Sequence, residues 1–338
     1  MNQPFSTSAP GRLCLFGEHQ DYLGLPVIAM AMNRRCHLHF EPRDDHKVRL
    51  VSQALGEMAS WNLDVRDEER TDDPLRHAMR VLIDEFRPTS ATGWDVEVVS
   101  TIPIQAGCSS STALMTAWIA AWLHILQGGF DASDIVRRCH QYEVLDFAGA
   151  GGDMDQFACG HGGLHRFGAG APQPLHLPDG VFILADSGQP KDTQGHLRRC
   201  RDARLPLMAD LDRNDMERTA DEMVLVKGTR INRDLEEKWG RRMQEEPAGA
   251  AAFGRDLTRH HEVLRDALGL STPRIENILH AALKAGAWGG KINGSGGGGC
   301  AFVLAPKDRT DSILESMLGA GAAGAWPVQM DQGVTCQM

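Results

Sequence analysis

A run of small polar residues between a strand and a helix could bind phosphate. Residues 107–112 read GCSSST, follow an alternating strand-like segment at 94–98, and precede a helix-forming, nearly uncharged segment at 113–126. Free backbone N–H groups and the helix dipole favour an anion there, and serine hydroxyls can bind phosphate or magnesium. An ordinary serine cap on a buried helix is the alternative. The candidate phosphate-binding residues are Gly107, Cys108, Ser109, Ser110, Ser111 and Thr112.

A second polar segment, 17–24, reads GEHQDYLG and lies between apolar strand-like segments at 13–16 and 27–32. Charged groups between buried strands are costly unless they face a ligand or solvent. Carboxylates accept hydrogen bonds from sugar hydroxyls, and an imidazole can donate or accept. The candidates for binding a polyol are therefore Glu18, His19 and Asp21, and a solvated hairpin loop is the alternative.

Carboxylates mark a third segment. Residues 148–157 read AGAGGDMDQF, so that glycines open a helix with Asp153 and Asp155 in its first turn. Acids that only complement the helix dipole are the alternative interpretation. Upstream, a helix predicted at 132–147 carries Glu143 among apolar neighbours, where a carboxylate needs a partner.

A glycine-rich segment, 288–305, reads WGGKINGSGGGGCAFVLA. A GxGxxG pattern occurs at 294–299, but the β-rich segment 300–304 follows it where a dinucleotide-binding site requires a helix. Gly290 and Lys291 match the GK of a Walker A motif, but Ile292 follows where that motif requires Ser or Thr, so the motif is excluded. We predict a strand, a glycine loop and a strand, in which missing side chains let the backbone approach a ligand or another loop.

Other elements must position these segments. Clear helix signals lie at 73–86 and 273–286, the second with Pro at its first position and Gly at its end. A chain of 338 residues exceeds the usual size of one core, so we expect two domains that share a cleft. The Gly- and Pro-punctuated segment 162–181 places the boundary, with domains at 1–170 and 171–338.

Composition limits the function. A net charge of −10 without a basic run argues against nucleic-acid binding and favours a small ligand. Eight cysteines without a CxxC pair, in a chain without a signal peptide, predict reduced thiols in a cytoplasm. No run approaches the length of a membrane span, and the histidines lack zinc-site spacing.

These segments, in this order, resemble the GHMP sugar and metabolite kinase superfamily. Residues 103–112, PIQAGCSSST, resemble the family's P-x3-G-L-x-S-S-A, with Cys108 for Leu and Thr112 for Ala. Gly11, Arg12 and the GEHQDY at 17–22 resemble the galactokinase signature GR-x4-GEHTDY, and GDMDQ at 152–156 resembles its GIMDQ. The loop NGSGGGGC at 293–300 resembles the third motif, in a form closer to mevalonate kinases and heptose-phosphate kinases.

The resemblance implies an α+β fold of two domains with the active site between them. The N-terminal domain would be of the ribosomal-protein-S5-like type, and the C-terminal domain a ferredoxin-like α/β sandwich. ATP and Mg²⁺ would be the cofactors. By the same resemblance, Asp155 and Arg12 would be catalytic, Ser110 and Ser111 would bind phosphate, Ser111 and Glu143 would bind magnesium, and Glu18, His19, Asp21 and Gly152 would contact the sugar.

The expected function is that of an ATP-dependent sugar kinase acting on a sugar hydroxyl, the anomeric one by resemblance. The galactokinase pattern also has a sugar-contacting tyrosine in the C-terminal half, whereas the only tyrosines here are Tyr22 and Tyr142. We therefore expect a sugar other than galactose. The segment 186–193, DSGQPKDT, resembles mevalonate kinases, which gives a second substrate class; a catalytically silent sugar and nucleotide sensor is the third hypothesis.

Overall fold

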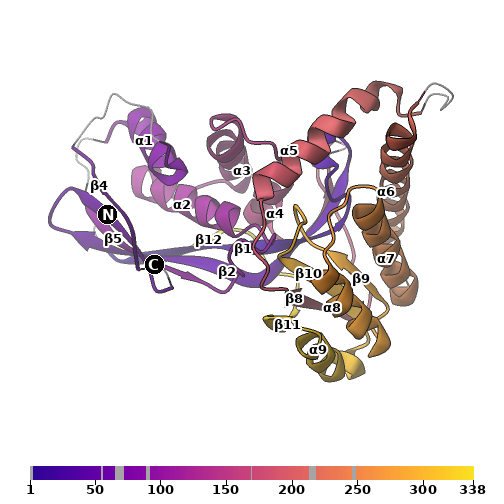
Figure 1. Cartoon of the computed structure of the whole chain (residues 1–338). Coiled ribbons are helices and arrows are strands. Elements are labelled where there is room, and N and C mark those ends of the chain that lie inside the picture. Colours follow the sequence, from indigo (N-terminus) through magenta and orange to yellow (C-terminus); the bar gives the residue numbers. More distant parts are fainter. Residues whose placement is uncertain are drawn as a thin grey trace.

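Two β-sheets organise the chain in the computed structural model, which describes residues 3–54, 56–64, 72–88, 92–168, 170–212, 218–245 and 249–338 (Figure 1). The strands of the larger sheet are β1 (Phe5–Phe16), β2 (Val27–Arg43), β3 (Lys47–Ser52), β4 (Gly56–Asn62), β5 (Gly93–Ser100), β6 (Leu164–Phe167), β7 (Gln173–Pro174) and β12 (Thr335–Gln337). Their order is β12-β1-β2-β5-β3-β4, and β6 joins β2 to β7. Every pair is antiparallel except β3 with β5.

Helix α2 (Ser110–Gln127) lies at the centre of the helical layer on this sheet (Figure 1). It is apolar on most sides and is buried accordingly, with Trp118 and Trp122 inside the core. Around it lie α1 (Pro74–Phe86), α3 (Ala132–His140) and α4 (Met154–His161), and Asp73 and Asp131 cap the first two. The helices predicted at 73–86 and 113–126 and the strand at 94–98 are confirmed.

The helix predicted at 132–147 is correct only in its first part. Helix α3 ends at His140, and a π-helical turn, Gln141–Leu145, continues it. Such turns insert an extra residue and are frequent at functional sites. Glu143 lies in this turn and points back to α2 through a hydrogen bond from Thr112.

The smaller sheet contains β8 (Val181–Asp186), β9 (Gly289–Ile292), β10 (Cys300–Ala305) and β11 (Gly324–Val328), all antiparallel, in the order β11-β8-β10-β9. Helices α5 (Thr193–Arg204), α6 (Ala220–Glu245), α7 (Ala250–Asp266) and α8 (Pro273–Lys284) lie between β8 and β9 in the chain. Helix α9 (Thr310–Gly319) connects β10 to β11. A β-α-β-β-α-β succession is the ferredoxin-like arrangement. The expected α+β fold is therefore confirmed.

Strand β8 connects two cores because successive side chains of a strand point to opposite faces. Phe182 and Leu184 belong to the large core that also contains Leu13 and Phe16 of β1. Ile183 and Ala185 pack on the other face, in a second core with α8 and α9. One apolar core thus runs from the larger sheet into the smaller one and fixes their loops relative to each other.

The chain ends in the sheet where it begins. Strand β12 pairs with residues 6–8 of β1, so both termini lie at the same end of the molecule (Figure 1). Apart from this strand, the larger sheet ends with β7 at Pro174 and the smaller sheet begins with β8 at Val181. Within the described residues, none of the helices has the length and apolar character that a membrane span requires.

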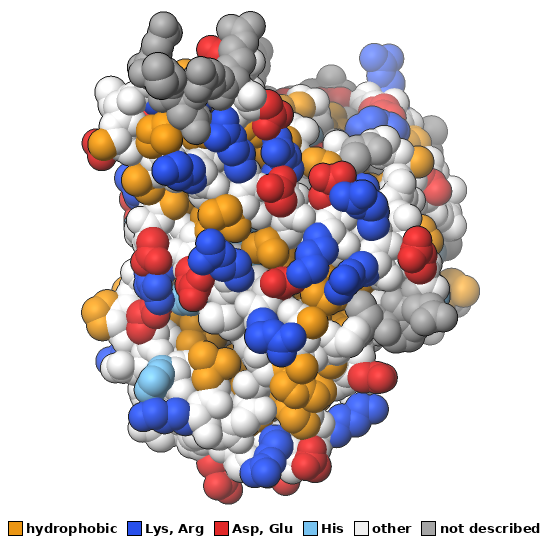
Figure 2. Space-filling model, turned by 90° about the vertical axis from the view of Figure 1, so that its right-hand side faces the viewer, with side chains coloured by type: hydrophobic (Ala, Val, Ile, Leu, Met, Phe, Trp, Pro, Cys, Tyr) orange, Lys and Arg blue, Asp and Glu red, His pale blue; other side chains and the backbone are white. Residues whose placement is uncertain are grey.

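The face in Figure 2, on the side of α6 and α7, carries basic and acidic side chains interspersed with one another. On α6, Arg233 forms an ion pair with Asp212 at 2.8 Å. On α7, Arg259 forms one with Glu262 at 3.1 Å. In both pairs a basic side chain of α6 or α7 lies beside a carboxylate.

Candidate active site

The serine loop, residues 105–112, enters α2 through unusual backbone geometry. Gln105 and Ser109 have φ values of 53° and 60°, a region that non-glycine residues rarely adopt and that is often found at functional sites. Ser109 is the N-cap of α2 but makes no side-chain capping hydrogen bond, and its buried hydroxyl has no partner among the described residues. The ordinary capping interpretation is therefore wrong for Ser109, and the first N–H groups of α2 stay available to a ligand.

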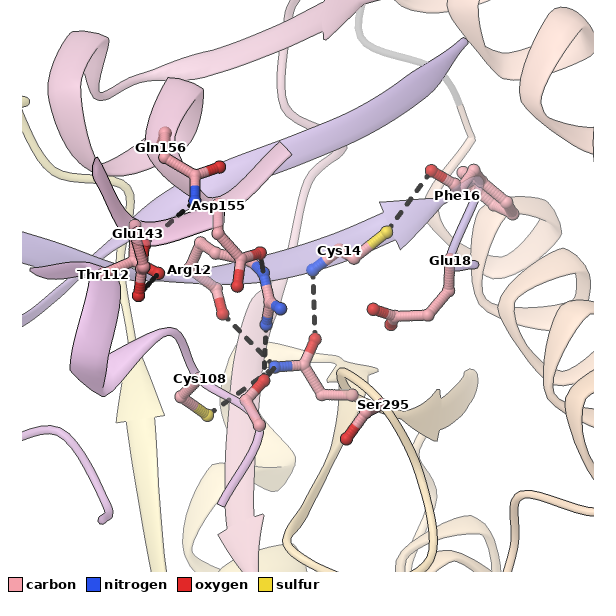
Figure 3. Close-up of polar contacts among 12 residues, drawn as sticks. Arg12, Cys14, Phe16, Glu18, Cys108, Thr112, Glu143, Asp155, Gln156 and Ser295 are labelled. Atoms are coloured by element: carbon pink, nitrogen blue, oxygen red, sulfur yellow. Dashed lines mark hydrogen bonds and ion pairs between the residues drawn. The ribbon is translucent and has the colours of Figure 1, made fainter. Parts of the chain in front are cut away.

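Arg12 and Asp155 form the ion pair beneath this loop. Arg12 Nε on β1 lies 2.7 Å from Asp155 Oδ1 in the first turn of α4, and Arg12 Nη1 donates to the carbonyl of Gly107 (Figure 3). Burial opposes the charge on Arg12, but Asp155 and Glu18 overcome this effect and raise its pKa. A single guanidinium thus connects the serine loop to the carboxylate of α4.

Asn293, at the start of the glycine loop 293–299, holds this arrangement together. Its Nδ2 donates to the carbonyl of Gly107 at 2.9 Å and to that of Arg12 at 3.2 Å, and its Oδ1 accepts from the Cys14 amide at 3.0 Å. A Cβ on Gly294 would lie 2.6 Å from the Gly107 carbonyl oxygen, so only glycine fits there. The predicted close approach of the glycine loop to another loop is confirmed.

Glu143 is buried behind the serine loop. Its carboxylate accepts from Thr112 Oγ1 at 3.0 Å and from Gln156 Nε2 at 2.9 Å (Figure 3). Burial raises its pKa, while hydrogen bonds from Thr112, Gln156 and Ser111 act in the opposite direction. The described residues contain no group of three or more His, Cys, Asp or Glu that could hold a metal. One carboxylate with a hydroxyl still fits Mg²⁺, which keeps water and phosphate oxygens as its other ligands.

The acceptor loop, residues 17–24, lines the same cavity as the serine loop. Glu18 is buried and forms an ion pair with Lys291, with Oε2 and Nζ 2.5 Å apart. His19 has φ 62°, and its ring bonds Tyr22 Oη through Nδ1 at 2.7 Å and the Ser295 carbonyl through Nε2 at 3.2 Å. Glu18 and His19 are therefore held in position by Lys291 of β9, by Ser295 of the glycine loop and by Tyr22 of their own loop.

Asp21 and Gly152 lie against each other. A Cβ on Gly152 would be 2.5 Å from Asp21 Oδ2, so a side chain at position 152 would displace the carboxylate. Burial, and then the nearby Asp155, raise the pKa of Asp21 to about 6. An ionised Asp21 is therefore held at a cost in free energy, as is common for groups that serve a ligand.

A cavity of about 520 Å³ joins these groups. Of the predicted residues, it is lined by Arg12, Glu18, His19, Asp21, Gly107, Ser109, Ser110, Ser111, Thr112, Glu143, Gly152 and Asp155. Cys108 does not line it; its buried side chain lies beside Asn293 instead, and its carbonyl accepts from the Arg12 amide. Lys191 and Ser295 also line the cavity; neither is among the predicted residues, although DSGQPKDT and the glycine loop contain them.

Comparisons with known proteins agree with this geometry. Residues 74–163 match the GHMP kinases N terminal domain, residues 248–323 match the GHMP kinases C terminal domain, and residues 1–42 match the galactokinase galactose-binding signature. Mevalonate kinase from Pyrococcus abyssi is 30% identical over 327 residues, which cover 93% of this chain and 92% of that protein. Galactokinase from Canis lupus familiaris is 28% identical over 341 residues, covering 92% of this chain and 86% of that protein.

The solved structure of Lactococcus lactis galactokinase complexed with galactose superposes with a TM-score of 0.79 at 20% identity, covering 98% of this chain and 95% of that one. Mevalonate kinase from Methanococcus jannaschii superposes with a TM-score of 0.78 at 17% identity, covering 98% and 99%. Both likenesses confirm the two-domain fold. With its serine loop, Arg12–Asp155 pair and glycine loop, the chain belongs to the GHMP kinase family.

Proposed function

We propose that the protein transfers the γ-phosphoryl group of ATP to a sugar hydroxyl, the anomeric one by its resemblance to galactokinases. The observation that carries this proposal is the Arg12–Asp155 pair, which lies between the serine loop and the acceptor loop in one cavity. Phosphoryl transfer depends mainly on positioning and charge stabilisation, and these residues can provide both.

In the proposed reaction, Asp155 accepts the proton of the acceptor hydroxyl, whose oxygen attacks the γ-phosphorus. The electron pair of the broken bond goes to the β-phosphate oxygen of ADP. Arg12 stabilises the charge of the transferring group. The N-terminal amides of α2 and the hydroxyls of Ser109 and Ser110 bind the phosphates.

Ser111 and Glu143 are the proposed holders of Mg²⁺. The Ser111 side chain hydrogen-bonds to the Glu143 carboxylate, and Thr112 and Gln156 orient that carboxylate. A magnesium ion bound there would offset the negative charge of the nucleotide phosphates. The orienting hydrogen bonds matter because ligands held by neighbouring donors bind metals in a fixed geometry.

A sugar is the acceptor that the loop chemistry favours. Asp21 offers a carboxylate that can accept hydrogen bonds from hydroxyl groups, and residues 1–42 match a galactose-binding signature. A site built for one hydroxyl pattern discriminates strongly against others. Because the C-terminal tyrosine of galactokinases has no counterpart here, we expect galactose to be a poor substrate.

Mevalonate is the second candidate acceptor. The relatives that are 30% identical are mevalonate kinases, and the segment 186–193 resembles theirs. Arg12 stands where those enzymes carry lysine, and the EHQDY of the acceptor loop is of the sugar type, which favours the sugar.

The test is a substrate panel. Purified protein with ATP and Mg²⁺ is incubated with hexoses, pentoses, uronic acids and mevalonate while ADP release is measured, and NMR locates the phosphate in the product. We expect phosphorylation of a non-galactose sugar at the anomeric oxygen. Mevalonate as the best acceptor would establish the second candidate. If the protein binds the nucleotide but none of these compounds causes ADP release, the sensor hypothesis would be supported.

A further inference from the structure

The cavity contains a second cation, besides Arg12, that the reaction described above does not use. The described residues that line the cavity include one arginine, Arg12, and one lysine, Lys191. Arg12 is engaged by Asp155 and Gly107. Lys191 Nζ donates to the hydroxyl of Ser295 at 2.9 Å, and within the described residues no carboxylate forms an ion pair with it. Two N–H bonds of this ammonium are therefore available to a ligand.

The ammonium of Lys191 lies where the loops of the two sheets meet. It is 2.7 Å from the position that a Cβ on Gly107 would occupy, so it touches the beginning of the serine loop. Its partner Ser295 belongs to the glycine loop, and the Ser295 carbonyl contacts the ring of His19. The ammonium therefore lies between the serine loop and the residue of the glycine loop that contacts His19.

The surroundings of Lys191 favour an anion. Burial lowers the pKa of Lys191, and the nearby positive charge of Arg12 lowers it further. Two cations that face one cavity repel each other until a negative group lies between them. An oxygen of a phosphoryl group between Arg12 and Lys191 would be attracted by both, and more strongly as charge develops on it.

We propose that Lys191 is a catalytic residue that donates hydrogen bonds to an oxygen of the γ-phosphoryl group during transfer. Ser295 is its positioning residue. The inference rests on the proposed phosphotransferase function. The bond from the acceptor oxygen to phosphorus forms, the bond to the β-phosphate oxygen breaks, and its electron pair stays with ADP, while Lys191 keeps its proton throughout.

The alternative role for Lys191 is to bind a carboxylate of the acceptor. The contact with Gly107 and the proximity of Arg12 favour the phosphoryl group, because both belong to the phosphate side of the cavity. The two roles predict different kinetics. A residue that acts in transfer lowers kcat when it is removed, whereas one that binds the acceptor raises its KM.

The experiment compares Lys191→Met, Lys191→Arg and Ser295→Ala with wild type. Lys284→Met is the matched control, because Lys284 is exposed at the end of α8. We expect Lys191→Met to lower kcat by about 100-fold or more, with KM for acceptor and Kd for Mg·ATP changed less than about threefold. Lys191→Arg should recover part of the loss, Ser295→Ala should show a smaller loss, and Lys284→Met should match wild type.

Intrinsic ATP hydrolysis, with water as acceptor, gives a readout that does not require the right sugar. If wild type hydrolyses ATP but phosphorylates none of the panel, the sugar proposal fails while Lys191 can still be judged by this rate. A selective rise in KM for acidic acceptors would overturn the catalytic role, as would an unchanged kcat in Lys191→Met. Wild type without any ATP turnover would overturn both proposals.

Discussion

Arg12 Nε and Asp155 Oδ1 lie 2.7 Å apart, with the arginine side chain 5% and the aspartate side chain 29% exposed. The arginine of the pair is therefore buried while the aspartate is partly exposed, and both residues line the cavity. Arg12 occupies one carboxylate oxygen, which leaves the other for an acceptor hydroxyl. In the proposed reaction, Asp155 would therefore contact the acceptor hydroxyl, and Arg12 would contact both this carboxylate and the phosphates.

Asp155→Asn should lower kcat by at least about 100-fold, the scale of a positioned proton acceptor, because an amide cannot accept the hydroxyl proton. The amide oxygen can still accept from Arg12, so Kd for Mg·ATP should stay within about twofold. Steady-state kinetics and nucleotide titration measure both values. Asp153→Asn is the matched control, since Asp153 is exposed two residues before Asp155 and makes no side-chain capping hydrogen bond. An equal loss of nucleotide affinity in Asp155→Asn would contradict the assigned role.

Glu143→Gln should raise the Mg²⁺ concentration needed for half-maximal rate by about tenfold or more, because a charged oxygen ligand is lost. Ser111→Ala should show a smaller change of the same kind. Burial raises the pKa of Glu143, so protons compete with the ion and the Mg²⁺ requirement of wild type should increase as pH falls. Titrations at several pH values measure this, with Glu85→Gln as a control outside the cavity. A pH-dependent Mg²⁺ requirement that persists in Glu143→Gln would place the metal elsewhere.

The elements with strong local signals could be predicted from the sequence. Helix α8 has a Thr cap, an initial Pro and an apolar face, and α2 has a continuous run of helix formers, so each is specified without tertiary information. The π-helical turn at Gln141–Leu145 was missed because an insertion of one residue leaves no mark in propensity. Helix α7 was also missed, since its buried and exposed faces depend on packing against β9.

The site was predicted where motifs are contiguous and missed where distant segments meet. The acceptor and serine loops carry their chemistry in consecutive residues. Asn293, Lys191 and Lys291 are placed by the smaller sheet, and a lysine in a glycine-rich segment gives no indication of the carboxylate that it will meet. Glu18 is a candidate for binding a sugar hydroxyl by its sequence, but in the structure its carboxylate forms an ion pair with Lys291. The sequence could not show that Lys291 is buried beside it.

Asp21→Asn should stabilise the protein at pH 7.5 and weaken acceptor binding. The pKa of Asp21 is raised to about 6, so the folded protein binds this proton more tightly than the unfolded chain does. Its contribution to stability is present below about pH 4 and is lost as pH rises through about 6. The variant should therefore unfold at a Tm on the order of a few degrees above wild type at pH 7.5, with little difference at pH 4.

Thermal unfolding at both pH values and acceptor KM measure these effects, with the exposed Asp308→Asn as control. In wild type, acceptor KM should rise below about pH 6 as Asp21 becomes protonated, and this rise should be absent from the variant. A lower Tm for Asp21→Asn at pH 7.5 would contradict the assigned cost of holding the ionised carboxylate.

Lys291→Met should destabilise the protein by about 3–5 kcal/mol, because it leaves the Glu18 carboxylate buried without a counter-ion. The side chains of Lys291 and Glu18 are 0% and 2% exposed, and Lys291 Nζ also donates to the Cys14 carbonyl at 2.9 Å. Adding Glu18→Gln should restore part of the loss, since a neutral amide costs less to bury than an unpaired carboxylate. Urea unfolding of wild type, both single variants and the double variant forms a mutant cycle. If the double variant is as unstable as the sum of the singles, Lys291 stabilises the fold through packing and the Cys14 carbonyl, and Glu18 is not its charge partner in solution.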